Sequence, residues 1–294
     1  MSGADRRFER SAEDVGNIIE FGHVNLRVPD QRLATLFYAT GLGLTRDPFL
    51  RVGVENMWMN VGTSQFHLPT GPAQVLRGTV GLVMPDLDAL VKRLESVQAR
   101  LDGTSFAFRR HEGVIEATCP WGNRFRCHAP NPARFGRIVR GIPYLEIEAV
   151  PGSIAAIVRF YEEMLGVDAT AERDGAGAFA RVPAGLSGEL LFRDTGLSRP
   201  FDGHHVQITL ADFSGPHCRL LARGLVSEES SQHQYRFERV IDLENGSELA
   251  VIEHEVRSLR HPMFGRVHLN RDPEHTANSY TNGPEPAPWI TLES

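Results

Sequence analysis

Apolar and polar residues alternate in one recurring order along the chain. Residues 21–44 and 142–167 each begin as an alternating apolar strand and pass through a proline. They then continue into a segment whose apolar residues repeat every three to four positions. That spacing places the apolar side chains on one face of a helix. Each helical segment carries an aromatic pair, Phe37 and Tyr38 in the first and Phe160 and Tyr161 in the second. The pattern predicts two copies of a strand followed by a half-buried helix.

Two further segments, residues 78–101 and 203–226, follow the same order less regularly. Strand-like stretches come after each of the four helical segments. We therefore predict one repeated unit, made of a strand, a helix and three more strands. Its four copies cover residues 21–72, 78–130, 142–196 and 203–256.

The spacing of the units suggests how the chain is divided. Residues 129–141 are rich in proline and arginine, and periodicity fades after about residue 257. We predict an N-terminal arm (1–20), a first domain of two units (21–130), a linker (131–141), a second domain of two units (142–256) and an extended C-terminal tail (257–294) that packs on the surface.

Composition limits the partners and the compartment. Hydrophobic residues make up 41% and charged residues 23%, and the net charge is −6. An acidic chain is a poor partner for nucleic acid or an anionic membrane, since both reward clustered positive charge. No apolar run is long enough to span a bilayer, and the first residues lack an apolar signal-peptide core. The three cysteines form no C-x-x-C pair, so we expect a reducing, cytoplasmic location.

Four units of this kind, with an F-Y-x-x-x-L-G type of helix end, resemble the vicinal oxygen chelate superfamily. This group includes glyoxalase I, extradiol dioxygenases, methylmalonyl-CoA epimerase and bleomycin-resistance proteins. The resemblance covers about residues 20–256 and implies an α+β fold, in which four tandem βαβββ units form two open mixed β-barrel clefts with flanking helices. It also implies one divalent metal in a cleft, held by residues of the first and last strand of each contributing unit.

The resemblance assigns one ligand position to each of these strands. The first strands place His23, Thr79, Tyr144 and His205 there, and the last strands place His67, Arg126, Phe192 and either Ala250 or Glu253. The same number of residues separates His205 from Glu253 as separates Tyr144 from Phe192, which favours Glu253. Glu248 is the reserve carboxylate.

The pairing of units decides whether these residues meet. If unit one pairs with unit two, the ligand sets are split between two barrels. If unit one pairs with unit four, one cleft holds His23, His67, His205 and Glu253, and the other holds no good ligand. We favour the second arrangement, in which the ring nitrogens of His23 and His205 lie roughly 3 Å apart around one metal.

Three imidazoles and a carboxylate suit Zn²⁺, Fe²⁺, Mn²⁺ or Ni²⁺ and would serve Mg²⁺ or Ca²⁺ poorly. In the other cleft, Arg126 and Tyr144 are candidate substrate-binding residues, because an arginine can bind a carboxylate through two hydrogen bonds. A surface ion pair is an equally good interpretation of Arg126.

The resemblance implies a metal-dependent isomerase or lyase that acts on a small hydroxy-carbonyl or aromatic-derived substrate, with Glu253 as a catalytic carboxylate. An extradiol dioxygenase is the first alternative, although Tyr144 stands where such enzymes place a histidine. A metal-free small-molecule binder of the bleomycin-resistance type is the second. The expected partners are a small-molecule substrate and, as an option, a second copy of the chain in a homodimer.

Overall fold

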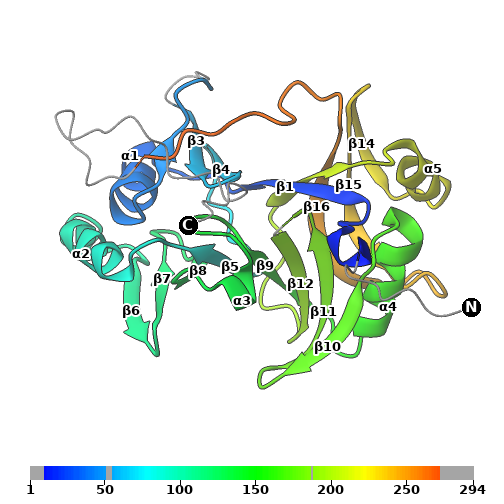
Figure 1. Cartoon of the computed structure of the whole chain (residues 1–294), viewed down its shortest axis with the longest axis horizontal. Helices are drawn as coiled ribbons and strands as arrows, with labels where there is room; N and C mark the ends of the chain where they lie inside the picture. The colour runs from blue at the N-terminus through cyan, green and yellow to red at the C-terminus, as the bar shows by residue number, and fades with distance from the viewer. Residues whose placement is uncertain (1–9, 51–54, 187, 272–294) are drawn as a thin grey trace, which may run out of the picture.

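The computed structural model describes residues 10–50, 55–186 and 188–271. Sixteen strands and a few short helices make up this part of the chain (Figure 1). The strands are β1 (Ile18–Asn25), β2 (Thr45–Arg46), β3 (Asn56–Val61), β4 (Ser64–Pro69), β5 (Gly78–Val83), β6 (Ala107–His111), β7 (Val114–Thr118), β8 (Arg124–His128), β9 (Tyr144–Ala149), β10 (Thr170–Asp174), β11 (Gly177–Ala184), β12 (Gly188–Asp194), β13 (His205–Leu210), β14 (Val226–Ser231), β15 (Gln234–Ile241) and β16 (Glu248–Ser258).

The main helices are α1 (Gln31–Ala34) with its π-helical continuation η2 (Thr35–Gly41), α2 (Leu87–Gln98), α3 (Pro132–Phe135), α4 (Ile154–Phe160) with η3 (Tyr161–Leu165), and α5 (Ser214–Ala222). A 3₁₀ turn, η1 (Arg10–Glu13), precedes β1. Among the described residues, no helix is long and apolar enough to cross a membrane.

The strands form two open, mixed, eight-stranded sheets. The first has the order β14-β15-β16-β13-β1-β4-β3-β2, and the second has the order β10-β11-β12-β9-β5-β8-β7-β6. Each unit contributes four neighbouring strands, so the predicted α+β fold of four βαβββ units is confirmed. Four of these helices lie in pairs at the two ends of the molecule, α1 and α2 at one end and α4 and α5 at the other (Figure 1).

The sheets join the first unit to the fourth and the second to the third. In the first sheet β1 runs antiparallel to β13, with Val24 opposite Val206. In the second sheet β5 runs antiparallel to β9, with Val80 opposite Leu145. The predicted pairing of units one and four is therefore confirmed. Each of the two predicted sequence domains contributes one unit to each sheet.

Two of the helices begin at the same sequence signal. Asp30 and Asp86 both follow a proline and both adopt an extended backbone. The carboxylate of Asp30 accepts hydrogen bonds from the backbone N–H groups of Arg32 and Leu33, and Asp86 caps α2 in the same way. Such caps satisfy N–H groups that have no partner within the helix. They explain why the chain turns from strand to helix at equivalent places in units one and two.

The repeated aromatic pairs lie in the core between the two sheets. Tyr38 contacts Phe66 of β4 and Phe125 of β8, with ring centroids 5.3 and 5.9 Å apart. Tyr161 lies equivalently at the other end, 5.3 Å from the ring of Phe192 on β12. Its hydroxyl bonds to His254 of β16 at 2.7 Å. Each helix therefore packs one aromatic pair against a strand of both sheets.

The described part of the tail crosses the first sheet from β16 back to β3 (orange in Figure 1). Arg257 contacts the sulfur of Met263 at 3.6 Å at one end of this crossing. At the other end, Asn60 of β3 donates a hydrogen bond to the carbonyl of Leu269, and Asn270 exchanges two hydrogen bonds with the backbone of Gly62. The expected tail begins within β16, which ends at Ser258, and its residues 272–294 lie outside the described residues.

The ion pair between Arg266 and Asp47 anchors this segment. The guanidinium lies 3.1 and 3.0 Å from the two carboxylate oxygens of Asp47, whose side chain is fully buried. Burial opposes ionisation of Asp47. Backbone hydrogen bonds from Leu50 and Phe49, together with Arg266, outweigh it and lower the pKa of this carboxyl group.

We expect Arg266→Ala to lower the free energy of unfolding by about 1.5–3 kcal/mol at pH 7, the usual contribution of a hydrogen-bonded charge. Because the pKa of Asp47 is lowered in the folded state, its stabilisation is present above the unfolded pKa of about 3.9 and is lost as the pH falls through the folded value. Urea unfolding at pH 7 and at about pH 2.5, below the unfolded pKa, should therefore show a smaller difference from the wild type at the lower pH. Arg260→Ala, at an exposed position of the same segment, is the control. Equal midpoints for both variants at pH 7 would contradict the anchoring role.

Candidate metal centre

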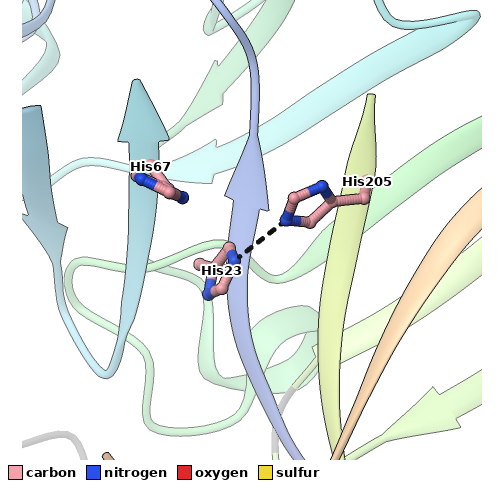
Figure 2. A group of neighbouring side chains, drawn as sticks. All are labelled: His23, His67 and His205. Atoms are coloured by element: carbon pink, nitrogen blue, oxygen red, sulfur yellow. Dashed lines mark hydrogen bonds between the residues drawn. The ribbon is translucent and has the colours of Figure 1, made fainter. Parts of the chain in front are cut away.

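Three histidines from neighbouring strands of the first sheet come together at one place. His23 lies on β1, His67 on β4 and His205 on β13, and the strand order places β1 between the other two (Figure 2). One ring nitrogen of each histidine lies within 4.8 Å of the others. The Nε2 atoms of His23 and His205 are 3.4 Å apart, although 182 residues separate the two in sequence. This separation fits the arrangement expected for pairing of units one and four.

The strand register explains why the three histidine side chains lie close together. Asn25 lies opposite both His205 and His67 in the two ladders of β1. Side chains alternate between the faces of a strand, so His23 and Asn25 share one face. His23 is therefore diagonally adjacent to both other histidines. The side-chain oxygen of Asn25 is buried and has no hydrogen-bond partner within the described part of the chain.

Neighbours on β3 orient the ring of His67. The ring stacks on Trp58 with centroids 3.9 Å apart and an angle of 11° between the planes. Its Nε2 atom is 2.6 Å from the amide oxygen of Asn56. An amide oxygen only accepts hydrogen bonds, so Nε2 carries the proton and Nδ1 is the candidate ligand atom.

Two of the imidazoles are neutral at physiological pH. Burial, followed by the charge of Arg257, holds the pKa of His23 well below its usual value. Burial, followed by the proximity of His205, lowers the pKa of His67 to about 3. A histidine binds a metal through an unprotonated ring nitrogen, so both rings are in the form that a metal requires.

Two carboxylates meet the two nitrogens of His205. The Nδ1 atom is 3.1 Å from Oε1 of Glu253, and the Nε2 atom is 3.4 Å from Oε2 of Glu255. Burial opposes ionisation of Glu253, but its hydrogen bond from His205 and the charge of Arg236 outweigh burial and lower its pKa. Glu253 therefore faces the nitrogen that points away from His23, and Glu255 faces the nitrogen that points toward it.

Sequence reasoning missed Glu255. In unit one, His23 lies opposite Gln65, and His67 comes two residues later on β4. In unit four, His205 lies opposite Glu253, and Glu255 comes two residues later on β16. The register thus makes Glu255 the equivalent of His67. Counting residues from the first strand reaches Glu253 instead, two residues earlier on the same face of β16.

The reserve carboxylate is not part of this group. Glu248 lies at the start of β16, where it is exposed and pairs with Arg239 at 3.3 Å. His204, next to His205 in sequence, is directed to another partner, since its Nδ1 atom is 2.7 Å from Asp202. Of these two adjacent histidines, His205 is the one that joins the cluster.

The equivalent positions of the second sheet hold other residue types than histidine. Tyr144 is buried, and its hydroxyl lies 2.8 Å from Nε2 of His128. The ring of Phe135, from the predicted linker, packs 5.1 Å from that of His128. Arg126 is half exposed and lies 4.0 Å from Glu146. A role for Arg126 and Tyr144 in substrate binding stays a prediction, and neither residue lies on the sheet of the histidines.

Phe192 does not occupy a ligand position. The ladder between β9 and β12 places Glu189, not Phe192, opposite Tyr144. Phe192 instead packs against Tyr161 in the core. The residue count that aligned Phe192 with Glu253 was therefore wrong for unit three.

Comparison with solved structures identifies the fold. Glyoxalase I of Zea mays has a TM-score of 0.53 at 13% sequence identity, over 81% of this chain and 92% of that chain. A "putative dioxygenase" of Bacillus subtilis has a TM-score of 0.53 at 15% identity, over 82% of this chain and 86% of that chain. No model of a protein family and no curated protein matches the sequence.

These likenesses show that the chain shares the fold of these two proteins, in agreement with the fold predicted from the repeated units. Identities this low support the fold and leave the chemistry to be argued from the residues. The fold and the site together define a protein of four βαβββ units whose first sheet carries a candidate metal centre.

Proposed function

We propose that this protein is a divalent-metal-dependent enzyme of the glyoxalase-like type. His23, His67 and His205 are the proposed imidazole ligands, and the clustering of their ring nitrogens carries the proposal. Zn²⁺, Fe²⁺, Mn²⁺ and Ni²⁺ are the candidate metals, because imidazole nitrogen suits these ions.

The donor set fits such an ion. The Nδ1 atom of His205 faces an ionised carboxylate, which only accepts hydrogen bonds, so Nδ1 carries a proton. The Nε2 atom of His205 lies 3.4 Å from Nε2 of the neutral ring of His23 and 3.4 Å from Oε2 of Glu255. Two imidazole nitrogens and a carboxylate oxygen thus converge on one point, and donors of these types suit a transition-metal ion. The arrangement therefore favours a shared cation.

The contacts favour Glu255 as the fourth ligand. Sequence analysis named Glu253 as ligand and catalytic residue, but Glu253 contacts the nitrogen of His205 that faces away from the cluster. Glu255 contacts Nε2, is almost fully buried and is the register equivalent of His67. In this proposal Glu253 orients the ring of His205, as carboxylates commonly do for metal-bound histidines.

The chemistry we propose is proton transfer next to a carbonyl group. A bound metal would polarise substrate oxygens and stabilise negative charge that develops on them. We assign Glu255 a second role as proton acceptor, in which its carboxylate would give up its place as a ligand when substrate oxygens bind. The unpartnered side-chain oxygen of Asn25 is placed to accept a hydrogen bond from a substrate hydroxyl. A small hydroxy-carbonyl compound meets these requirements.

We expect protein purified without a histidine tag to contain about one equivalent of transition metal per chain, or to take it up on dialysis against Zn²⁺, Mn²⁺, Ni²⁺ or anaerobic Fe²⁺. Metal content by mass spectrometry of the digested protein measures this. Absence of binding for all four ions would refute the metal centre and support the small-molecule binder.

The reaction class is tested by hydrogen exchange. Small hydroxy-carbonyl compounds are incubated in D₂O with the metal-loaded protein, and loss of the signal of the proton next to the carbonyl is followed by NMR. We expect exchange with the wild type and a large loss of it in Glu255→Gln. Metal-loaded protein that exchanges no compound of the panel would count against the isomerase and lyase chemistry. Oxygen uptake by the Fe²⁺ protein with a catechol would instead indicate a dioxygenase.

A further inference from the structure

Arg236 of β15 joins the two carboxylates that contact His205. One terminal guanidinium nitrogen bonds to Oε1 of Glu253, and the other bonds to Oε2 of Glu255 at 2.7 Å. These are also the two carboxylate oxygens that lie next to Nδ1 and Nε2 of His205. Arg236, the two glutamates and the imidazole therefore form a closed ring of contacts beside the histidine cluster.

Arg236 contacts both carboxylates, and a terminal nitrogen of Arg257 lies 2.6 Å from the other oxygen of Glu255. Glu253 and Glu255 alternate with His254 on β16, so their side chains share one face of the sheet. Both side chains are largely buried, with exposed fractions of 16% and 5%. Two buried like charges repel each other more strongly than they would in water. The planar guanidinium can hold both at once, and the single ammonium of a lysine cannot do so in the same geometry.

We infer that Arg236 is a positioning residue for the metal centre. It holds Glu253 at Nδ1 of His205, which fixes the orientation of the ring and directs Nε2 toward His23. It also holds Glu255 beside Nε2, where this carboxylate completes the donor set. The inference rests on the proposed function, since it assigns Arg236 a task at that same site.

A positioning role at the metal centre distinguishes Arg236 from an arginine that only forms an ion pair on the surface. Arg239, three residues later on β15, pairs with Glu248 at 3.3 Å, with both side chains about half exposed. It is an arginine on the same strand with a glutamate partner on the same neighbouring strand. Arg239→Gln is therefore a matched control that removes a comparable ion pair away from the histidines.

The experiment loads the wild type, Arg236→Met, Arg236→Lys and Arg239→Gln with Co²⁺. The dissociation constant is measured by competition with a chelator, and the visible absorption spectrum reports the ligand geometry. We expect Arg236→Met to weaken Co²⁺ binding about 10–100-fold, the usual effect of losing a residue that orients a metal ligand. Its spectrum should also change in position or intensity. Arg236→Lys should recover part of the affinity, and Arg239→Gln should match the wild type in both measurements.

Thermal unfolding of the metal-free variants shows whether a loss of Co²⁺ affinity results only from a loss of protein stability. Arg236→Met that binds Co²⁺ with the affinity and spectrum of the wild type would overturn the inference and leave the proposed function standing, whatever its melting temperature. If Arg236→Met does not fold, Arg236→Lys decides in its place, and wild-type affinity and spectrum in that variant would overturn the inference. A wild type that binds no Co²⁺ would overturn the metal centre and this inference together.

Discussion

His205→Ala is expected to lower the affinity for a transition metal about 100-fold while the protein stays folded. Zinc sites with four ligands contribute about 10–16 kcal/mol of binding energy, so one ligand of four corresponds to roughly 3 kcal/mol. Removing the ring costs little packing, because it lies in a polar group of histidines and glutamates rather than among the apolar side chains of the core. Metal content after dialysis and circular dichroism measure the two parts of this expectation.

His217→Ala is the matched control for this variant. His217 lies on α5, where it pairs with Glu229 at 2.7 Å on the protein surface. It should keep the metal content of the wild type. If His205→Ala keeps its full metal content, or unfolds, the assignment of His205 as a ligand is wrong. His23→Ala should behave as His205→Ala does, because its Nε2 atom faces the same point.

Phe66→Ala is expected to lower the free energy of unfolding by about 3–5 kcal/mol, the range for truncating a buried aromatic side chain. Phe66 is fully buried, and its ring lies 5.3 Å from that of Tyr38 and 5.9 Å from that of Phe125. Since Phe125 belongs to the other sheet, the cavity would open between the two sheets. Urea unfolding of the metal-free protein measures the loss.

Phe49→Ala removes the same side chain from an exposed position, where 71% of the residue is accessible. We expect it to change the stability by no more than about 0.5 kcal/mol. A similar loss for the two phenylalanine variants would show that the contact between the sheets does not carry the stability assigned to it here. Phe66→Leu, which refills part of the volume, should fall between the two.

The repeated pattern was sufficient to predict the fold, because each unit uses the same local signals. Asp30 and Asp86 begin helices after a proline, and the paired aromatics at Tyr38 and Tyr161 fill equivalent places in the core. These signals depend on neighbours in sequence. The pairing of units one and four does not depend on neighbours in sequence. It was predicted from the positions of the residues that can bind a metal.

The carboxylate of the candidate metal centre could not be predicted from the sequence. Residue counting assumes that hairpins of equal length follow each first strand. In unit three, Tyr144 lies opposite Glu189, three residues before the position that counting assigned. Register depends on hydrogen bonds between strands, and a shift of one residue turns a side chain to the other face of the sheet. The histidines could be located because each lies in a short alternating strand, whereas the choice between Glu253 and Glu255 required the ladder itself.

The antiparallel junction between β1 and β13 also determines when the site can form during synthesis. His23 on β1 and His205 on β13 lie 182 positions apart in the sequence, and the intervening units two and three form a sheet of their own. Contacts between such distant segments form slowly, because a long loop must close first. On the ribosome, β1 has no strand beside it on this edge until unit four has emerged, and it exposes an unpaired edge in the meantime. The nascent chain should therefore acquire the second sheet before the histidine cluster, and a chain released early should lack a metal centre even when most of its residues are present.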